Sequence, residues 1–225
     1  MRGIRLNLSI GGTNDSMVGC QRFRTAAERI KGHNWHAQMY TSLAMSFAIT
    51  DLVAASPVPV VCDHFGGIQA EFGPQQPGFA ELVELVQSGQ AYVKLSDVYP
   101  ASTLAPAYGD VVPFIYALIA ATPDHLVWGT EWPHPNSNPP PRRKPTDVTP
   151  LYQIDDGRLL IQLPVCAPDA AMRKKILVDN AARLHALRAA ARCRDPPSWK
   201  GGTSMRLRTA GSSIPNQTLN TTAGM

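Results

Sequence analysis

One carboxylate in the sequence stands where an α/β protein could use it for chemistry. The stretch 125–135 opens with the apolar run Leu126–Trp128 and reaches Glu131 just before Pro133 and Pro135 prevent further strand pairing. In α/β barrels the catalytic groups lie at the carboxyl ends of the strands, so Glu131 is a catalytic candidate. The alternative is that Glu131 caps the loop or pairs with a surface cation.

Side-chain alternation places polar residues of several predicted strands on a shared face. Successive strand residues point to opposite faces of a sheet. The polar residues grouped in this way are Arg5 and Asn7, then His36, Gln38 and Tyr40, then His64 in phase with Val60 and Cys62, then Lys94 and Ser96, and finally Glu131 in phase with Gly129 and Val127. A barrel with a polar upper layer would use all of them. Taken singly, Tyr40 and Lys94 could lie at a rim, and His64 could be a hydrogen-bonded core histidine.

The elements that must position these residues alternate between strand and helix. Short β-branched runs and amphipathic stretches ended by Gly32 and Gly89 set the pattern. Strands are predicted at 1–8, 36–41, 92–96, 126–131 and in the VVCDHFGG segment from Val60, and helices at 16–31, 43–55, 79–88, 108–121 and 169–188. Residues 136–150 read as a proline-rich loop. Repeated right-handed βα crossovers give a parallel sheet, either doubly wound or part of a (β/α)8 barrel.

Length and composition limit the class of protein. A chain of 225 residues with 44% hydrophobic content can bury one core, so residues 1–195 are predicted to form a single domain. Apolar runs are too short to span a bilayer and the amino terminus lacks a signal-peptide core, so we expect a cytoplasmic protein without membrane partners. The four cysteines show no C-x-x-C spacing and are interpreted as reduced thiols: Cys20, Cys62, Cys166 and Cys193.

The positive charge of the chain is concentrated in its last segment. From Arg188 onward there are six basic residues and one acidic residue, a net charge of +5 in a chain whose total is +4. Residues 196–225 are rich in Gly, Ser, Thr, Asn and Pro, which predicts a disordered tail. No nucleic-acid partner is expected, because beyond Trp199 the tail offers no aromatic residue for stacking.

Six motifs in order resemble one known family. RGIRLNL, WHAQMYT, PVPVVCDHFGG, YVKLSDVYP, HLVWGTEWPHP and ILVDNAARLHAL are similar to the amidohydrolase-related family, in the branch similar to 2-pyrone-4,6-dicarboxylate lactonase. The resemblance runs from Met1 to about Leu187. It implies an α/β fold of the TIM-barrel-like metal-dependent-hydrolase type, here incomplete with about the last five β/α units. It also implies hydrolysis of a small lactone, ester or amide by water.

Carried over residue by residue, the resemblance assigns roles to six side chains. Glu131 stands where the family has the general base that activates water, and His64 where a histidine polarises the carbonyl or assists proton transfer. Arg5 and Tyr40 match positions that hold a substrate carboxylate or oxyanion. The two residues expected to line the pocket are Lys94 and Ser96. By contrast, Asn180 and Arg183 are interpreted as structural.

The sequence departs from the family pattern in three places. The chain begins at what looks like the fourth strand, so the His-x-His pair that holds zinc in metal-dependent members is missing, and we predict no metal and no cofactor. Glu131 replaces the aspartate of the family motif. Its extra methylene displaces the carboxylate by more than about 1 Å, which is enough to affect the geometry of attack on the substrate. Tyr99 and Pro100 stand where the branch often has an arginine.

Two other functions stay open. A truncated barrel could be a non-catalytic fragment or binding module, and its open edges would leave it poorly stable or self-associating. A decarboxylase of the same superfamily is the second alternative, although it would need a metal. In the enzyme interpretation the partner is a small-molecule substrate.

Overall fold

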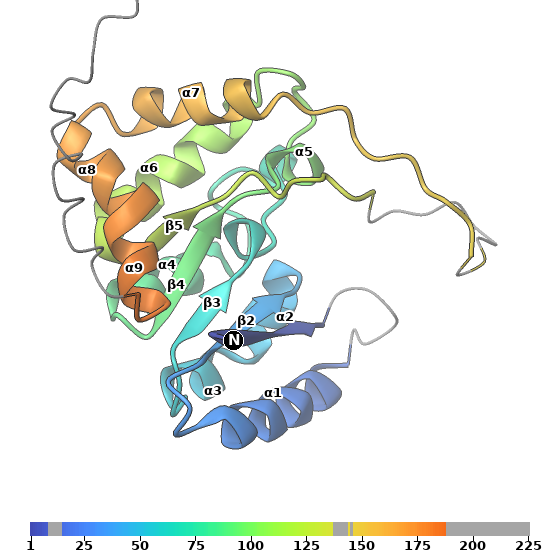
Figure 1. The fold of residues 1–225 in the computed structure, drawn as a ribbon, viewed down its shortest axis with the longest axis vertical. Coiled ribbons are helices and arrows are strands. Elements are labelled where there is room, and N and C mark those ends of the chain that lie inside the picture. Colours follow the sequence, from blue (N-terminus) through green and yellow to red (C-terminus); the bar gives the residue numbers. More distant parts are fainter. Residues whose placement is uncertain (9–14, 137–143, 145, 188–225) are drawn as a thin grey trace, which may run out of the picture. The chain divides into compact units, whose positions relative to one another are not determined.

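Five parallel strands form one sheet in which each strand pairs with the next along the chain (Figure 1). The structure is a computed structural model that describes residues 1–8, 15–136, 144 and 146–187. The strands are β1 (Gly3–Asn7), β2 (His36–Tyr40), β3 (Val60–Cys62), β4 (Ala91–Leu95) and β5 (Leu126–Trp128). The predicted parallel α/β sheet is therefore confirmed. The predictions for 188–225, including the tail and Cys193, lie outside the described residues.

Helices connect the strands and follow the last one. They are α1 (Ser16–Ile30), α2 (Leu43–Ala48), α3 (Thr50–Ala54), α4 (Phe79–Gln87), α5 (Val98–Ala101), α6 (Val112–Ala121), α7 (Asp156–Cys166), α8 (Ala170–Lys174) and α9 (Asn180–Leu184). Short 3-10 turns occupy His64–Gly66, Ala70–Phe72, Gly109–Val111 and Pro123–His125, and a π-helical turn, Lys175–Asp179, joins α8 to α9. None of the described helices is long and apolar enough to cross a membrane.

The two faces of the sheet are set by the strand register. Arg5 pairs with Gln38, Gln38 with Val61, and Lys94 with Val127. Residues directly opposite one another in neighbouring strands share a face. We call the face that carries Arg5, Gln38, Val61, Tyr92, Lys94 and Val127 the inner face. The residues between them lie on the opposite face, which we call the helix-covered face.

The helix-covered face supplies the main hydrophobic core. The strand residues of this face that are at most 2% exposed are Ala37, Met39, Val60, Cys62, Ala91, Val93, Leu95 and Leu126. They pack against apolar side chains of α1, α3, α4, α6 and α7, including Phe23, Val53, Val86, Phe114, Leu118 and Leu163. Each fully buried side chain of this size contributes about 1.5–3 kcal/mol to folding. This face therefore holds the sheet to its helices.

The cysteines among the described residues form no disulfide. Cys20, Cys62 and Cys166 are free thiols, as predicted. Burial, and to a smaller extent the charge of Asp63, raises the pKa of the Cys62 thiol to about 12. Cys62 is therefore a packing residue of the core rather than a nucleophile.

Several predicted element boundaries were wrong. The single helix predicted at 43–55 is interrupted at Ile49, where the Thr50 hydroxyl donates to the Ser46 carbonyl at 3.1 Å and favours a bend. β5 ends at Trp128, three residues before Glu131. The helix predicted at 108–121 begins only at Val112, after a 3-10 turn.

The carboxyl-terminal helices also differ from the prediction. α7 was not predicted, although Asp155 caps it by accepting from the Arg158 backbone N–H at 3.1 Å. Pro164 inside α7 hides the helical pattern because proline usually ends a helix. The final helix predicted at 169–188 is divided by its π-helical turn, and α9 ends at Leu184.

Candidate active site

A non-glycine residue in the left-handed backbone region follows each of the last three strands. His64 has φ 50°, Asp97 has φ 55° and Glu131 has φ 70°. Side chains with a Cβ rarely adopt this conformation, which costs on the order of 1–3 kcal/mol and is often found at functional sites. The three side chains converge, since His64 Nε2 lies 3.8 Å from Asp97 Oδ2 and 3.9 Å from Glu131 Oε1.

The backbone turn at His64 corrects the predicted phase of this residue. Val60 and Cys62, with which His64 was grouped, lie on the helix-covered face. Asp63 continues the alternation onto the inner face, where it contacts Gln38. His64 reaches the same side only because the chain leaves the extended conformation after β3. The residue was therefore placed at the site for the wrong reason.

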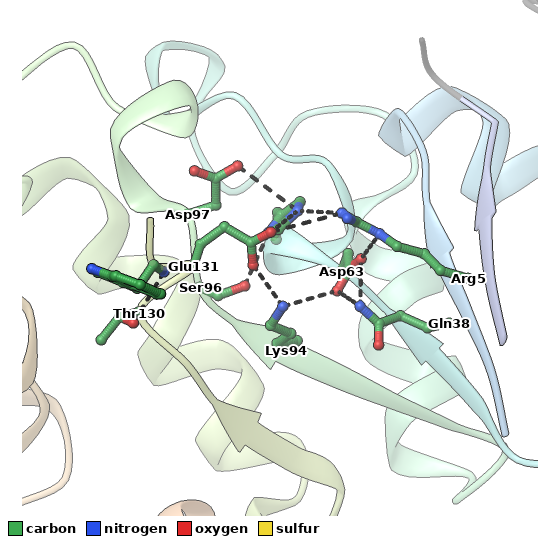
Figure 2. A network of polar contacts seen from close by, with 10 residues as sticks. Arg5, Gln38, Asp63, Lys94, Ser96, Asp97, Thr130 and Glu131 are labelled. Atoms are coloured by element: carbon green, nitrogen blue, oxygen red, sulfur yellow. Dashed lines mark hydrogen bonds and ion pairs between the residues drawn. The ribbon is translucent and has the colours of Figure 1, made fainter. Parts of the chain in front are cut away.

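Asp63 lies at the centre of a polar network drawn from four strands (Figure 2). Its side chain is fully buried and accepts from Gln38 Nε2 at 2.8 Å on both oxygens. Arg5 Nε lies 3.0 Å from one carboxylate oxygen and Lys94 Nζ 3.5 Å from the other. A buried carboxylate that contacts this many donors fixes the direction of two cations. Sequence reasoning missed Asp63. Asp63 directly follows β3, and a position after a strand was the reason for choosing Glu131.

Glu131 is held as an ionised carboxylate. Lys94 Nζ donates to its Oε2 at 2.7 Å, and Arg5 Nη2 lies 3.9 Å from its Oε1. Burial raises the pKa of Glu131, but the Lys94 hydrogen bond and charge, together with His64 and Arg5, outweigh burial and leave the pKa below its ordinary value. The carboxylate can accept a proton at neutral pH, and Oε1 is the oxygen that faces His64.

The neighbours of His64 define its tautomer. A guanidinium has donors only, so Arg5 Nη2, 3.1 Å away, donates to His64 Nε2. The ring proton is therefore on Nδ1, which donates to Ser96 Oγ at 2.9 Å. Burial lowers the pKa of His64, although the nearby carboxylates of Asp63, Asp97 and Glu131 oppose this effect. His64 is thus a neutral imidazole with its lone pair directed at the centre of the site.

Tyr40 supports both His64 and Arg5. Its ring meets the His64 ring edge to face, with centroids 5.1 Å apart, and the Arg5 guanidinium carbon lies 5.2 Å from the Tyr40 ring centroid. The structure thus brings together all six residues predicted for the site, which are Arg5, Tyr40, His64, Lys94, Ser96 and Glu131. Their chemical roles stay predictions.

Asp97 is a further site residue that sequence reasoning missed. Burial raises the pKa of its carboxyl group, and the Tyr99 hydroxyl and His64 oppose this effect. Its Oδ2 lies 3.8 Å from His64 Nε2, and Figure 2 shows the Asp97 side chain beside the polar network. The available signal was its place directly after Ser96 at the end of a strand, which is the position that singled out Glu131.

His134 fixes the loop that carries Glu131 through contacts with Tyr152 and Asp156. This histidine is buried, its backbone N–H donates to the Glu131 carbonyl at 2.8 Å, and its own carbonyl accepts from Tyr152 N–H at 2.9 Å. His134 Nε2 lies 3.0 Å from Asp156 Oδ1 at the start of α7. The helix that the sequence did not predict therefore helps to position the candidate base.

Asn180 and Arg183 bind backbone groups rather than the site. Asn180 is fully buried and its Nδ2 donates to the carbonyls of Pro123 and Leu126, both at 2.7 Å. Arg183 Nη1 donates to the Asp124 carbonyl at 3.2 Å. These contacts attach α9 to the start of β5, in agreement with the structural interpretation.

The described side chains offer acid–base and electrostatic groups. Within residues 1–8, 15–136, 144 and 146–187, no group of three or more His, Cys, Asp or Glu side chains is arranged to hold a metal ion. What these residues bring together is an ionised carboxylate, a neutral imidazole, a guanidinium and an ammonium. Such groups can activate water and stabilise a developing oxyanion.

The chain is similar to known proteins over most of its described residues. A family model described as Amidohydrolase matches residues 1–187. The 4-sulfomuconolactone hydrolase of Rhizobium radiobacter is 37% identical over 158 residues, which are 68% of this chain and 50% of that protein. The 2-pyrone-4,6-dicarboxylate hydrolase of Comamonas testosteroni is 33% identical over 168 residues, 71% of this chain and 51% of that protein.

A solved structure shows the same fold. The crystal structure of a proposed 2-pyrone-4,6-dicarboxylic acid hydrolase from Pseudomonas putida is 30% identical and has a TM-score of 0.63, with 83% of this chain and 63% of that chain covered. The expected TIM-barrel-like fold and the resemblance drawn from the six motifs are both confirmed. The chain spans about half the length of the curated relatives it matches.

Proposed function

Since the chain belongs to the amidohydrolase family, we propose that it is a hydrolase of a small, carboxylate-bearing lactone or related ester or amide. The observation that supports this proposal is the convergence of Glu131, His64 and Arg5 at the carboxyl ends of the strands. An ionised carboxylate, an imidazole lone pair and a guanidinium within 4 Å of one another are the groups that water attack on a carbonyl requires.

In the proposed mechanism Glu131 Oε1 accepts a proton from water as the water oxygen bonds to the carbonyl carbon. The carbonyl oxygen takes the negative charge, and the Arg5 guanidinium lies where it can stabilise that charge. The ring C–O bond then breaks, and the proton passes to the leaving oxygen. His64 Nε2 carries a lone pair in the tautomer inferred from its contacts, so His64 would assist proton transfer rather than polarise the carbonyl.

We propose that this chemistry uses no metal and no cofactor.

We also propose that the chain associates with itself through the edges of its sheet. β1 pairs only with β2, and β5 only with β4, among the described strands. Unpaired edges of this kind favour strand addition by another copy. Sedimentation at several concentrations tests this association, and a monomer at all of them would contradict it.

Replacing the base tests the proposed hydrolase. Glu131→Gln keeps the shape but removes the proton acceptor, so the hydrolysis rate should fall by about 10²- to 10⁴-fold. Glu131→Asp is the matched control because it keeps a carboxylate and should retain far more activity. The assay follows ring opening of lactone carboxylates, including 2-pyrone-4,6-dicarboxylate. Unchanged turnover in Glu131→Gln would exclude Glu131 as the base.

The non-catalytic alternative has a distinct outcome in the same experiment. A chain that binds lactones but hydrolyses none of them would favour a binding module. That result would be consistent with a sheet whose edge strands, β1 and β5, each pair with one neighbour among the described strands.

A further inference from the structure

Two carboxyl groups lie near the same nitrogen of one histidine. His64 Nε2 is 3.9 Å from Glu131 Oε1 and 3.8 Å from Asp97 Oδ2. Asp97 follows β4 and Glu131 follows β5, and Figure 2 shows both side chains at one polar network. Glu131 is the proposed base, whereas Asp97 has no role in the proposed mechanism so far.

The two carboxyl groups differ in their charged partners. Glu131 accepts from Lys94 Nζ at 2.7 Å and lies 3.9 Å from Arg5 Nη2. No lysine or arginine in the described part of the chain lies within ion-pair distance of Asp97, and its buried Oδ1 makes no hydrogen bond of ordinary geometry there. A buried carboxylate without a cation or a donor is costly, and the neutral acid avoids most of that cost.

The titratable groups that face Asp97 leave its pKa above the ordinary value. Burial has the largest effect and raises this pKa, and the charge of Glu131 raises it further. The Tyr99 hydroxyl, His64 and Lys94 lower it without outweighing burial. By contrast, the pKa of Glu131 lies below its ordinary value, because its cationic neighbours outweigh the effect of burial. Two carboxyl groups whose environments separate them in this way are suited to be the acid and the base of one reaction.

We propose that Asp97 is the general acid that protonates the oxygen leaving the carbonyl carbon. This inference rests on the proposed function and assigns the second proton transfer of that reaction. As the C–O bond of the tetrahedral intermediate breaks, its electron pair stays on the leaving oxygen, which takes the proton of the Asp97 carboxyl group. The product is a hydroxyl group, and Asp97 is left as a carboxylate.

The same contacts offer a route by which the site is reset. After the reaction Glu131 holds the proton that it took from water, and Asp97 lacks one. His64 Nε2 lies close to both groups, so it can take the proton from Glu131 and pass it to Asp97. Arg5, which donates to this nitrogen at 3.1 Å, frees it when the guanidinium engages the product carboxylate.

Two esters that differ only in their leaving oxygen test the role of Asp97. Monomethyl and mono-4-nitrophenyl glutarate share one acyl group, but methoxide needs a proton to leave and 4-nitrophenolate does not. In the full chain, Asp97→Asn should slow methyl ester hydrolysis by about 10²- to 10⁴-fold and nitrophenyl ester hydrolysis by less than about tenfold. Glu131→Gln should slow both. Equal losses for the two esters in Asp97→Asn, or no loss for either, overturn the inference.

The design of the variant separates chemistry from folding. Asparagine has the size of aspartate and is one of the residues that tolerate the left-handed backbone found at Asp97. The control is Asp124→Asn, which removes a surface carboxylate paired with Lys175 and should change neither rate. The acid must hold its proton to act, so the lactone rate should fall as pH rises through the raised pKa of Asp97. Persistence of that decline in Asp97→Asn contradicts the assignment.

The proton on Asp97 can also be located without turnover. In the full chain labelled with ¹³C at the aspartate carboxyl carbons, the Asp97 signal is identified by its absence from Asp97→Asn. It should titrate at higher pH than the signal of Asp124, whose pKa the hydrogen bond from Lys175 lowers. Titration together with Asp124, or below it, overturns the inference. A wild-type chain that hydrolyses no lactone or ester contradicts the proposed hydrolase, and this titration still decides whether Asp97 holds the proton.

Discussion

The two faces of the sheet carry opposite kinds of side chain on consecutive residues. Met39 is fully buried among apolar helices, while Gln38, its neighbour in β2, donates to Asp63 on the inner face. Cys62 and Asp63 differ in the same way at the end of β3. Alternation along a strand therefore lets one short segment pack against the helices on one side and contribute to the candidate site on the other.

The inner face itself changes along the strands. Towards their amino ends, Val61, Tyr92 and Val127 form a small apolar cluster with Leu184 of α9. Along β3 and β4, the network residues Asp63 and Lys94 lie two residues further along the chain than Val61 and Tyr92. The alternation of side chains decides which face a residue occupies. Its position along the strand decides whether it lies at the candidate site.

The largest expected difference between the two faces comes from substitutions at two neighbouring residues of β2, one of which should affect mainly stability and the other mainly activity. Met39→Ala removes a fully buried side chain and should lower the free energy of unfolding by about 2–5 kcal/mol. Gln38→Ala should cost only about 1 kcal/mol, because it removes hydrogen bonds of a half-buried amide, but should lower the rate about tenfold by loosening Asp63. Urea unfolding measures the free energy of unfolding of each variant, and the lactone assay measures its hydrolysis rate. The opposite ranking in either measurement would contradict this division.

Removing the charge of Asp63 should affect stability and activity together. Asp63→Asn leaves Arg5 and Lys94 without their shared carboxylate, and because Arg5 is half exposed and can rehydrate, we expect a loss of about 1–3 kcal/mol in unfolding free energy. Asp124→Asn is the control, since its ion pair with Lys175 is on the surface and should contribute less than about 1 kcal/mol. Similar losses in the two variants would show that burial of Asp63 has no special importance.

The smallest expected change is a shift of a pH profile. Lys94 lowers the pKa of Glu131, so Lys94→Met should raise that pKa and move the acidic limb of kcat/KM to higher pH. Lys174→Met removes an exposed lysine of α8 that pairs with Asp179 and should leave the limb in place. If the limb does not move in Lys94→Met, the group that titrates is not Glu131.

Strand periodicity predicted most of the framework but not the turns that shape the site. The residues of β1, β2 and β4 were located because alternation and β-branched runs are local signals. The prediction for His64 assumed that the extended backbone continued past Cys62, whereas the left-handed turn at His64 lies beyond it. Asp97 was missed at a similar turn after β4. Tertiary packing selects such strained conformations, so they leave little trace in local propensity.

The order of the strands has a consequence for how this chain can fold during synthesis. Every pairing in the sheet joins a strand to the next one in the sequence, from β1 with β2 to β4 with β5. A newly made βα unit therefore finds its partner already synthesised and close in sequence, which keeps the loop-closure entropy of each step small. The growing sheet can be extended one unit at a time as the ribosome proceeds. Glu131 and α7 come late in this order, so the Lys94–Glu131 ion pair can form only after the Asp63 network has its framework.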